Sequence, residues 1–149
     1  MIITSLAIAA VLVALTFIMH FAALKTLAYR IHGGGRSLRR PLLVVLFTLF
    51  AVHVLEVLVY AVAFYAMELL RIGHLGGVVE TGAVPFRDHF YFSIASYTTL
   101  GIGDIFPHGT SRLVAGIEAL NGLVLIAWSA SFTYLMMERL WTGDRISET

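Results

Sequence analysis

Three long runs of apolar residues divide the chain, and polar or glycine-rich segments separate them. The runs extend from Ile2 to Leu24, from Leu42 to Leu70 and from Leu113 to Met137. Each is at least as long as the roughly 20 residues that a helix needs to cross the hydrocarbon core of a bilayer. The pattern therefore predicts three transmembrane helices, over residues 1–29, 42–71 and 111–138.

A shorter apolar and aromatic stretch, Phe90 to Tyr97, lies between the second and third predicted spans. It is too short to cross a membrane, and a Gly-x-Gly sequence at Gly101 and Gly103 follows it closely. Asp88 is an acceptable N-cap residue for a short helix at this place. We therefore expect a re-entrant or interfacial helix over residues 88–98.

The composition agrees with a membrane protein of a single domain. Of the 149 residues, 59% are hydrophobic and 13% are charged, whereas soluble domains carry about 25% charged residues. This balance excludes a soluble enzyme, a disordered chain and a disulfide-stapled secreted domain. The net charge of +1 gives no basic field for nucleic acid. A cleaved signal peptide is disfavoured because residues 1–24 contain no Lys or Arg.

Positive charge predicts the orientation of the chain. The segment after the first span contains basic residues and no acid; they are Lys25, Arg30, Arg36, Arg39 and Arg40. By the positive-inside rule, the loop 30–41 is cytoplasmic, so the N-terminus faces outward. The tail 139–149 is then cytoplasmic as well. We expect a multi-pass protein of the plasma membrane, or inner membrane, of a cell.

The sequence between Ser96 and Asp104 is the one that suggests chemistry. Glycine adopts positive φ readily, and alternating backbone handedness directs successive carbonyl groups to the same side. Four such segments around an axis would form stacked rings of oxygen that replace the water shell of an ion. The C-terminus of a short helix directed at that axis adds partial negative charge. This arrangement suits a cation and not an anion.

The seven residues Thr98-Thr99-Leu100-Gly101-Ile102-Gly103-Asp104 resemble the Thr-Thr-Val-Gly-Tyr-Gly-Asp filter of potassium channels. The resemblance extends from Asp88 to about Met137, and more loosely through the second span. It implies a pore domain over 42–138, with an outer helix 42–71, a pore helix 88–98, a filter 99–103 and an inner helix 111–138. The expected fold is thus an all-α membrane protein with three transmembrane helices, a re-entrant pore helix and a selectivity filter, assembled as a tetramer. The first span lies outside the resemblance.

The same resemblance implies roles for individual residues. Backbone carbonyls would coordinate ions in the filter, at Thr99, Leu100, Gly101, Ile102 and Gly103, with K⁺ held at the first four. Thr98, Asp104 and Tyr91 would support the filter. The sequence departs from the family where Leu100 replaces valine, Ile102 replaces tyrosine and Tyr91 replaces a tryptophan that bonds the filter aspartate. Ala95 stands where some members place a second acid.

Two residues of the third span have alternative interpretations. Gly122 lies where the family often has a hinge glycine, but a small residue also permits close helix packing. Glu118 is either a cation-attracting or filter-supporting group, or a protonated acid bonded to Ser93, Ser96 or nearby backbone.

His53 and Glu56 share one face of the second span. They form either a pH sensor or, as is more common, an internal hydrogen-bonded pair that orients helices. A metal site with two histidines is not expected, because no third ligand lies at helical spacing.

These observations predict a potassium-selective channel subunit that conducts passively, with K⁺ ions, membrane lipids and three further copies of itself as partners. It is not expected to be an enzyme, and no cofactor is expected beyond the permeant ion. The alternative is a non-selective monovalent cation channel, suggested by Leu100 and Ile102. A cation transporter subunit or a non-conducting scaffold fits less well, since neither needs Thr99 together with both filter glycines.

Overall fold

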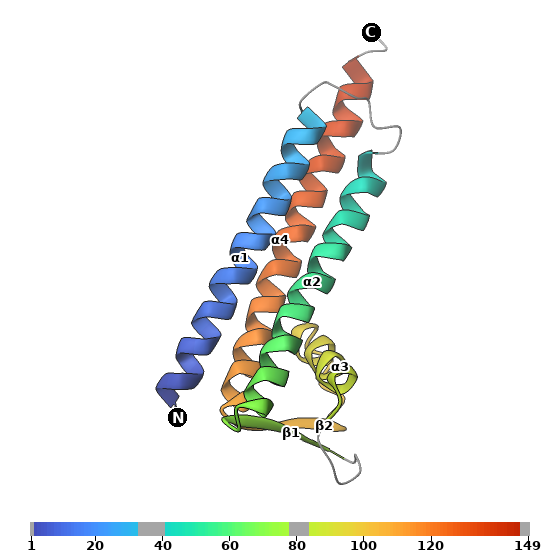
Figure 1. Cartoon of the computed structure of the whole chain (residues 1–149). Coiled ribbons are helices and arrows are strands. Elements are labelled where there is room, and N and C mark those ends of the chain that lie inside the picture. Colours follow the sequence, from blue (N-terminus) through green and yellow to red (C-terminus); the bar gives the residue numbers. More distant parts are fainter. Residues whose placement is uncertain (1, 33–40, 78–83, 147–149) are drawn as a thin grey trace.

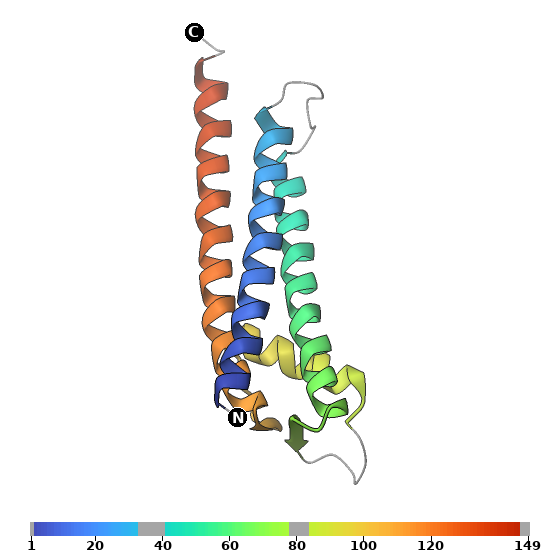
Figure 2. The ribbon, with the colours of Figure 1, turned by 60° about the vertical axis from the view of Figure 1, so that its left-hand side comes forward.

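The computed structural model describes residues 2–32, 41–77 and 84–146. Three long helices lie side by side: α1 (Ile2–His32), α2 (Pro41–Leu69) and α4 (Ser111–Ile146), as Figures 1 and 2 show. All three are long and apolar enough to cross a membrane, over Ile2–Ile31, Leu42–Leu69 and Ser111–Arg139. The three predicted spans are therefore confirmed.

The short helix α3 (Phe86–Tyr97) lies at the same end of the bundle as the N-terminus (Figure 1). We expected this helix to begin at Asp88, but its N-cap residue is Pro85, which has extended backbone (φ −67°, ψ 153°). Asp88 instead lies in the first turn, where its negative charge interacts favourably with the positive end of the helix dipole. Buried residues along α3 face the long helices, among them Phe92, Ser93 and Tyr97.

A two-stranded sheet, which the sequence analysis did not predict, lies at this end of the bundle. Strand β1 (Gly73–Gly77) pairs antiparallel with β2 (Ile105–Gly109), and His74 lies opposite His108. A Cβ atom at Gly77 would collide with the Asp104 carbonyl oxygen, so glycine is needed for the close approach of the strands. The sheet therefore joins the segment that follows α2 to the segment that follows Asp104.

The bounds of the long helices differ in part from the expected ones. The inner helix was expected to end at residue 138, where the apolar run ends, but α4 continues to Ile146. A helix does not require apolar residues once it leaves the bilayer, so hydropathy alone does not locate its end. Of the expected loop 30–41, positions 33–40, including Arg36, Arg39 and Arg40, lie outside the described residues.

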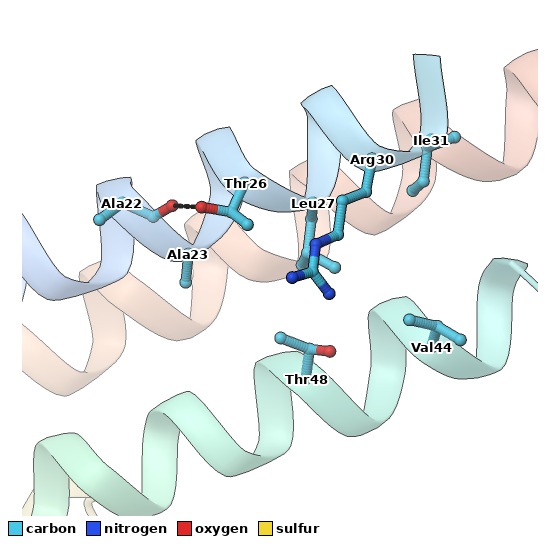
Figure 3. A pocket seen from close by; sticks show the side chains of 8 residues that line it. All are labelled: Ala22, Ala23, Thr26, Leu27, Arg30, Ile31, Val44 and Thr48. Atoms are coloured by element: carbon cyan, nitrogen blue, oxygen red, sulfur yellow. Dashed lines mark hydrogen bonds between the residues drawn. The ribbon is translucent and has the colours of Figure 1, made fainter. Parts of the chain in front are cut away.

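The long helices pack through an apolar core near the α3 end. Ala9, Tyr60, Phe64 and Val114 are buried there, from α1, α2 and α4. Toward the other end, a groove of about 290 Å³ separates α1 from α2, and the Arg30 side chain extends over it (Figure 3). The basic residue thus lies at the end of the bundle opposite α3.

Candidate functional site

The segment between α3 and β2 has an alternating backbone. Three alternate residues have positive φ: Thr99 at 58°, Gly101 at 56° and Gly103 at 86°. Such alternation directs successive carbonyls to one side of the chain. Glycine adopts positive φ at little cost, whereas for Thr99 the left-handed conformation costs about 1–2 kcal/mol. Thr99 therefore takes part in the same backbone alternation as the two glycines, in spite of this cost.

The side chains and backbone of this segment lie on the surface of the single chain. Every residue from Thr98 to Asp104 is exposed, and the Leu100 and Ile102 side chains are 62% and 56% exposed. Within the described chain, Ile102 therefore does not fill an apolar space. The segment offers a continuous, accessible row of backbone groups.

Hydrogen bonds attach the start of the segment to the last turn of α3. The Thr99 amide donates to the Ser96 carbonyl at 2.9 Å, and the Gly101 amide donates to the Ala95 carbonyl at 3.2 Å. The Thr98 hydroxyl donates to the Ile94 carbonyl at 2.7 Å. The C-terminal, partially negative end of α3 therefore leads directly into the segment.

The far end of the segment is held by Asp104. The Tyr91 hydroxyl donates to Asp104 Oδ2 at 3.0 Å, and the Ile105 amide donates to Oδ1 at 2.9 Å. Reduced hydration and the adjacent Asp104 carboxylate raise the pKa of the Tyr91 hydroxyl. A tyrosine thus makes the link to the carboxylate that the resemblance assigns to a tryptophan.

Helix α3 is also fixed at its two ends by carboxylates of α2. Near its start, His89 Nε2 lies 2.8 Å from Glu68 Oε2. At its last residue, the Tyr97 hydroxyl donates to Glu56 Oε2 at 2.6 Å. These bonds set the position of α3 along α2.

Gly122 lies where α4 passes against the end of α3. A Cβ atom there would collide with the Tyr97 carbonyl oxygen, while α4 runs as one helix through this position. The geometry is that of close packing through a small residue.

Glu118 is fully buried and contacts Ser93, whose hydroxyl oxygen lies 2.6 Å from Glu118 Oε1 and 2.8 Å from the Val57 carbonyl oxygen. A serine hydroxyl has one hydrogen, so both contacts are hydrogen bonds only when Glu118 supplies the other. Ser96, the other expected partner, donates to the Ala115 carbonyl at 3.0 Å. This arrangement fits the protonated acid better than the cation-attracting group.

His53 and Glu56 belong to a larger polar cluster that joins all four helices. His53 Nδ1 lies 3.1 Å from Glu56 Oε2 and 2.8 Å from the Tyr97 hydroxyl. His20, from α1, lies with its Nδ1 atom 2.9 Å from Glu56 Oε1. Both histidine rings contact the Ser129 hydroxyl through Nε2, at 3.0 and 3.2 Å. We call these five side chains the central cluster.

Sequence reasoning missed His20 as a member of the central cluster, because helical spacing relates residues of one helix, and His20 lies in α1 whereas His53 and Glu56 lie in α2. The signal was present: His20 is the one potentially charged residue in the first apolar run. A second polar link joins α1 to the other helices, since the Asn121 amide donates to Thr16 at 2.8 Å and to Tyr60 at 3.1 Å. Helix α1 is therefore an integral part of the bundle.

Comparison with known families agrees with this architecture. A family model described as an ion channel matches residues 52–139, which is more than half of the chain and covers most of α2, all of α3 and most of α4. No curated protein and no solved structure matches the chain.

Proposed function

The chain belongs to the ion channel family, and from this premise we propose that it is a potassium-selective channel subunit. It conducts K⁺ passively through backbone carbonyls, and no covalent reaction is involved. The observation that carries the proposal is the alternation of backbone handedness at Thr99, Gly101 and Gly103. This alternation is what a row of inward-pointing carbonyl oxygens requires.

In this proposal the ion-coordinating residues are consecutive, from Thr99 to Gly103, with K⁺ at Thr99, Leu100, Gly101 and Ile102. Thr98, Asp104 and Tyr91 support the filter. The hydrogen bond from Tyr91 to Asp104 supports this assignment, as do the amide bonds that fix Thr99 and Gly101 to α3. No cofactor is required beyond the permeant ion.

The proposed assembly is a homotetramer. One segment supplies one quarter of a coordination ring, so an ion needs four copies around an axis. The exposure of residues 98–104 supports this, because a filter wall is exposed in a single chain and covered in a ring.

The proposed orientation places the N-terminus and the filter outside and the C-terminus in the cytoplasm of a plasma or cell inner membrane. The N-terminus and α3 lie at one end of the bundle (Figure 1), and Arg30 lies at the other. A basic residue at that end agrees with the positive-inside rule.

Two measurements test the proposal. Flux into liposomes is compared for K⁺, Rb⁺ and Na⁺, and the mass of the protein is measured in mild detergent. We expect flux of K⁺ and Rb⁺ well above that of Na⁺, and a tetrameric mass. A protein found only as monomers and dimers under all conditions would count against the ring.

The alternative, a non-selective monovalent cation channel, is favoured by one observation. Leu100 and Ile102 stand where the potassium channel filter has valine and tyrosine, and neither side chain carries a hydroxyl that could hydrogen-bond the filter to α3. Equal K⁺ and Na⁺ flux in the same liposomes would select this alternative.

A further inference from the structure

We propose that the central cluster is a binding site for a divalent transition metal of the zinc type, held by His20, His53 and Glu56. The three ligand atoms come from α1 and α2 and lie within 4.8 Å of one another. Two imidazoles and one carboxylate are a ligand set that such metals accept. This site is separate from the proposed filter.

The spacing of the ligand atoms fits a small metal ion. Atoms that lie about 2.1 Å from a tetrahedral zinc ion are about 3.4 Å apart. His20 Nδ1 lies 2.9 Å from Glu56 Oε1, and His53 Nδ1 lies 3.1 Å from Glu56 Oε2. These two pairs, each to a different Glu56 oxygen, need to lengthen by a few tenths of an ångström, and the ligand atoms of the three residues lie within 4.8 Å of one another.

A count of hydrogens favours a cation at the centre. If both neutral rings carry their hydrogen on Nδ1, facing Glu56, then both Nε2 atoms are acceptors. Both Nε2 atoms contact the Ser129 hydroxyl, at 3.0 and 3.2 Å, but that hydroxyl has only one hydrogen. If one ring carries its hydrogen on Nε2 instead, its Nδ1 faces a Glu56 oxygen with no hydrogen between the two atoms. Two neutral rings and an ionised Glu56 are thus one positive charge short in every arrangement, and a proton or a metal ion supplies it.

A metal ion on the two Nδ1 atoms removes the conflict. Each ring then carries its hydrogen on Nε2, and both donate to Ser129, whose oxygen has two lone pairs. The Tyr97 hydroxyl donates to Glu56 Oε2 at 2.6 Å and orients the carboxylate. Partners of this kind, which hold the far side of each ligand, are typical of metal centres.

Burial also suits a bound metal. The His20 and Glu56 side chains are fully buried, whereas the His53 side chain is 20% exposed. An ion bound here would fasten α1 to α2 beside Tyr97, the last residue of α3 and two residues before Thr99. The metal would therefore hold α1 close to the end of α3, the helix that leads into the proposed filter.

The test uses full-length protein purified without a histidine tag, incubated with Zn²⁺ and then freed of unbound metal. We expect about one zinc per chain, and in Co²⁺-loaded protein the visible d–d bands of a four-coordinate site. His20→Ala and Glu56→Gln should lose the zinc. His74→Ala, which removes an exposed histidine from β1, is the matched control and should keep it.

Ser129→Ala keeps all three ligands and should weaken zinc affinity about 10–100-fold. If the ligand variants do not fold, wild-type protein still decides the question, through its cobalt spectrum and its melting temperature with Zn²⁺ and with a chelator. Wild-type protein with no retained zinc, an aqueous cobalt spectrum and no melting shift would overturn the site. The cluster would then hold a proton in place of a metal. Neither outcome depends on K⁺ flux, so the channel proposal is tested separately.

Discussion

Replacing Gly103 by alanine tests whether the backbone of residues 99–103 carries conduction. Gly103 has a φ of +86°, and a Cβ atom there would meet nothing closer than the Gly101 carbonyl oxygen at 4.0 Å. The substitution is therefore resisted by backbone conformation and not by a clash. An L-residue in the left-handed region costs about 1–2 kcal/mol, which is roughly 4–8 kcal/mol over four copies of the chain.

Every 1.4 kcal/mol is a factor of about ten in a population, so the conducting conformation should fall by roughly 10³-fold or more. The assay compares K⁺ and Na⁺ flux in liposomes that contain equal amounts of inserted protein. Gly116→Ala is the matched control, since Gly116 lies in α4 with nothing within 4 Å of an added Cβ. There, alanine should favour the helix by about 0.5–1 kcal/mol and leave flux unchanged.

A Gly103→Ala protein that inserts normally and keeps the wild-type ratio of K⁺ to Na⁺ flux would refute the reasoning. Loss of K⁺ flux in the Gly116→Ala control as well would show that the assay reports general damage to the fold. The filter assignment therefore depends on a difference between two glycines of the same chain.

Three further predictions follow from side-chain contacts. Gly122→Ala should destabilise the protein by about 1–3 kcal/mol through overpacking, seen as a lower melting temperature, and an unchanged temperature would contradict the close packing. Tyr91→Phe removes the hydrogen bond to Asp104, so K⁺ flux relative to wild type should fall most at low K⁺. A variant whose flux equals that of wild type at every K⁺ concentration would argue against a supporting role for Tyr91. Glu118→Gln should keep wild-type flux because an amide can donate to Ser93 as the protonated acid does. Glu118→Ala should lower the melting temperature. A large loss of flux in Glu118→Gln would mean that the charged acid is needed.

Hydropathy by itself was sufficient to predict the three long helices. Runs of apolar residues of this length have one stable conformation in a bilayer, since a helix satisfies its own backbone hydrogen bonds. The short helix before Thr98 was also predictable, although its start was not. Its N-cap residue is Pro85 and not Asp88. Pro85 has extended backbone and makes no capping hydrogen bond through its side chain, so the usual sign of a helix start is missing here.

The sheet could not be found in this way. Gly73, Gly76 and Gly77 lie close together between two apolar runs, and glycine in such a segment usually indicates a turn. In the structure they form β1, and Gly77 permits the close approach of the Asp104 carbonyl. Such a requirement comes from a partner strand that lies about thirty residues away in sequence, and no local pattern records it.

The candidate filter from Thr99 to Gly103 rests on the resemblance of residues 98–104 to a potassium channel filter. The amino-acid sequence alone determined the membrane class, the three spans, and the order of helix, glycine segment and helix. Each of these depends on local composition or on backbone freedom at single residues, which sequence expresses directly. Only the tertiary structure decided the surroundings of the buried polar groups. Whether His20 meets His53 and Glu56 depends on how α1 packs against α2. Helical periodicity relates residues within one helix, whereas the rotation and depth of one helix against another are set by packing over their whole length.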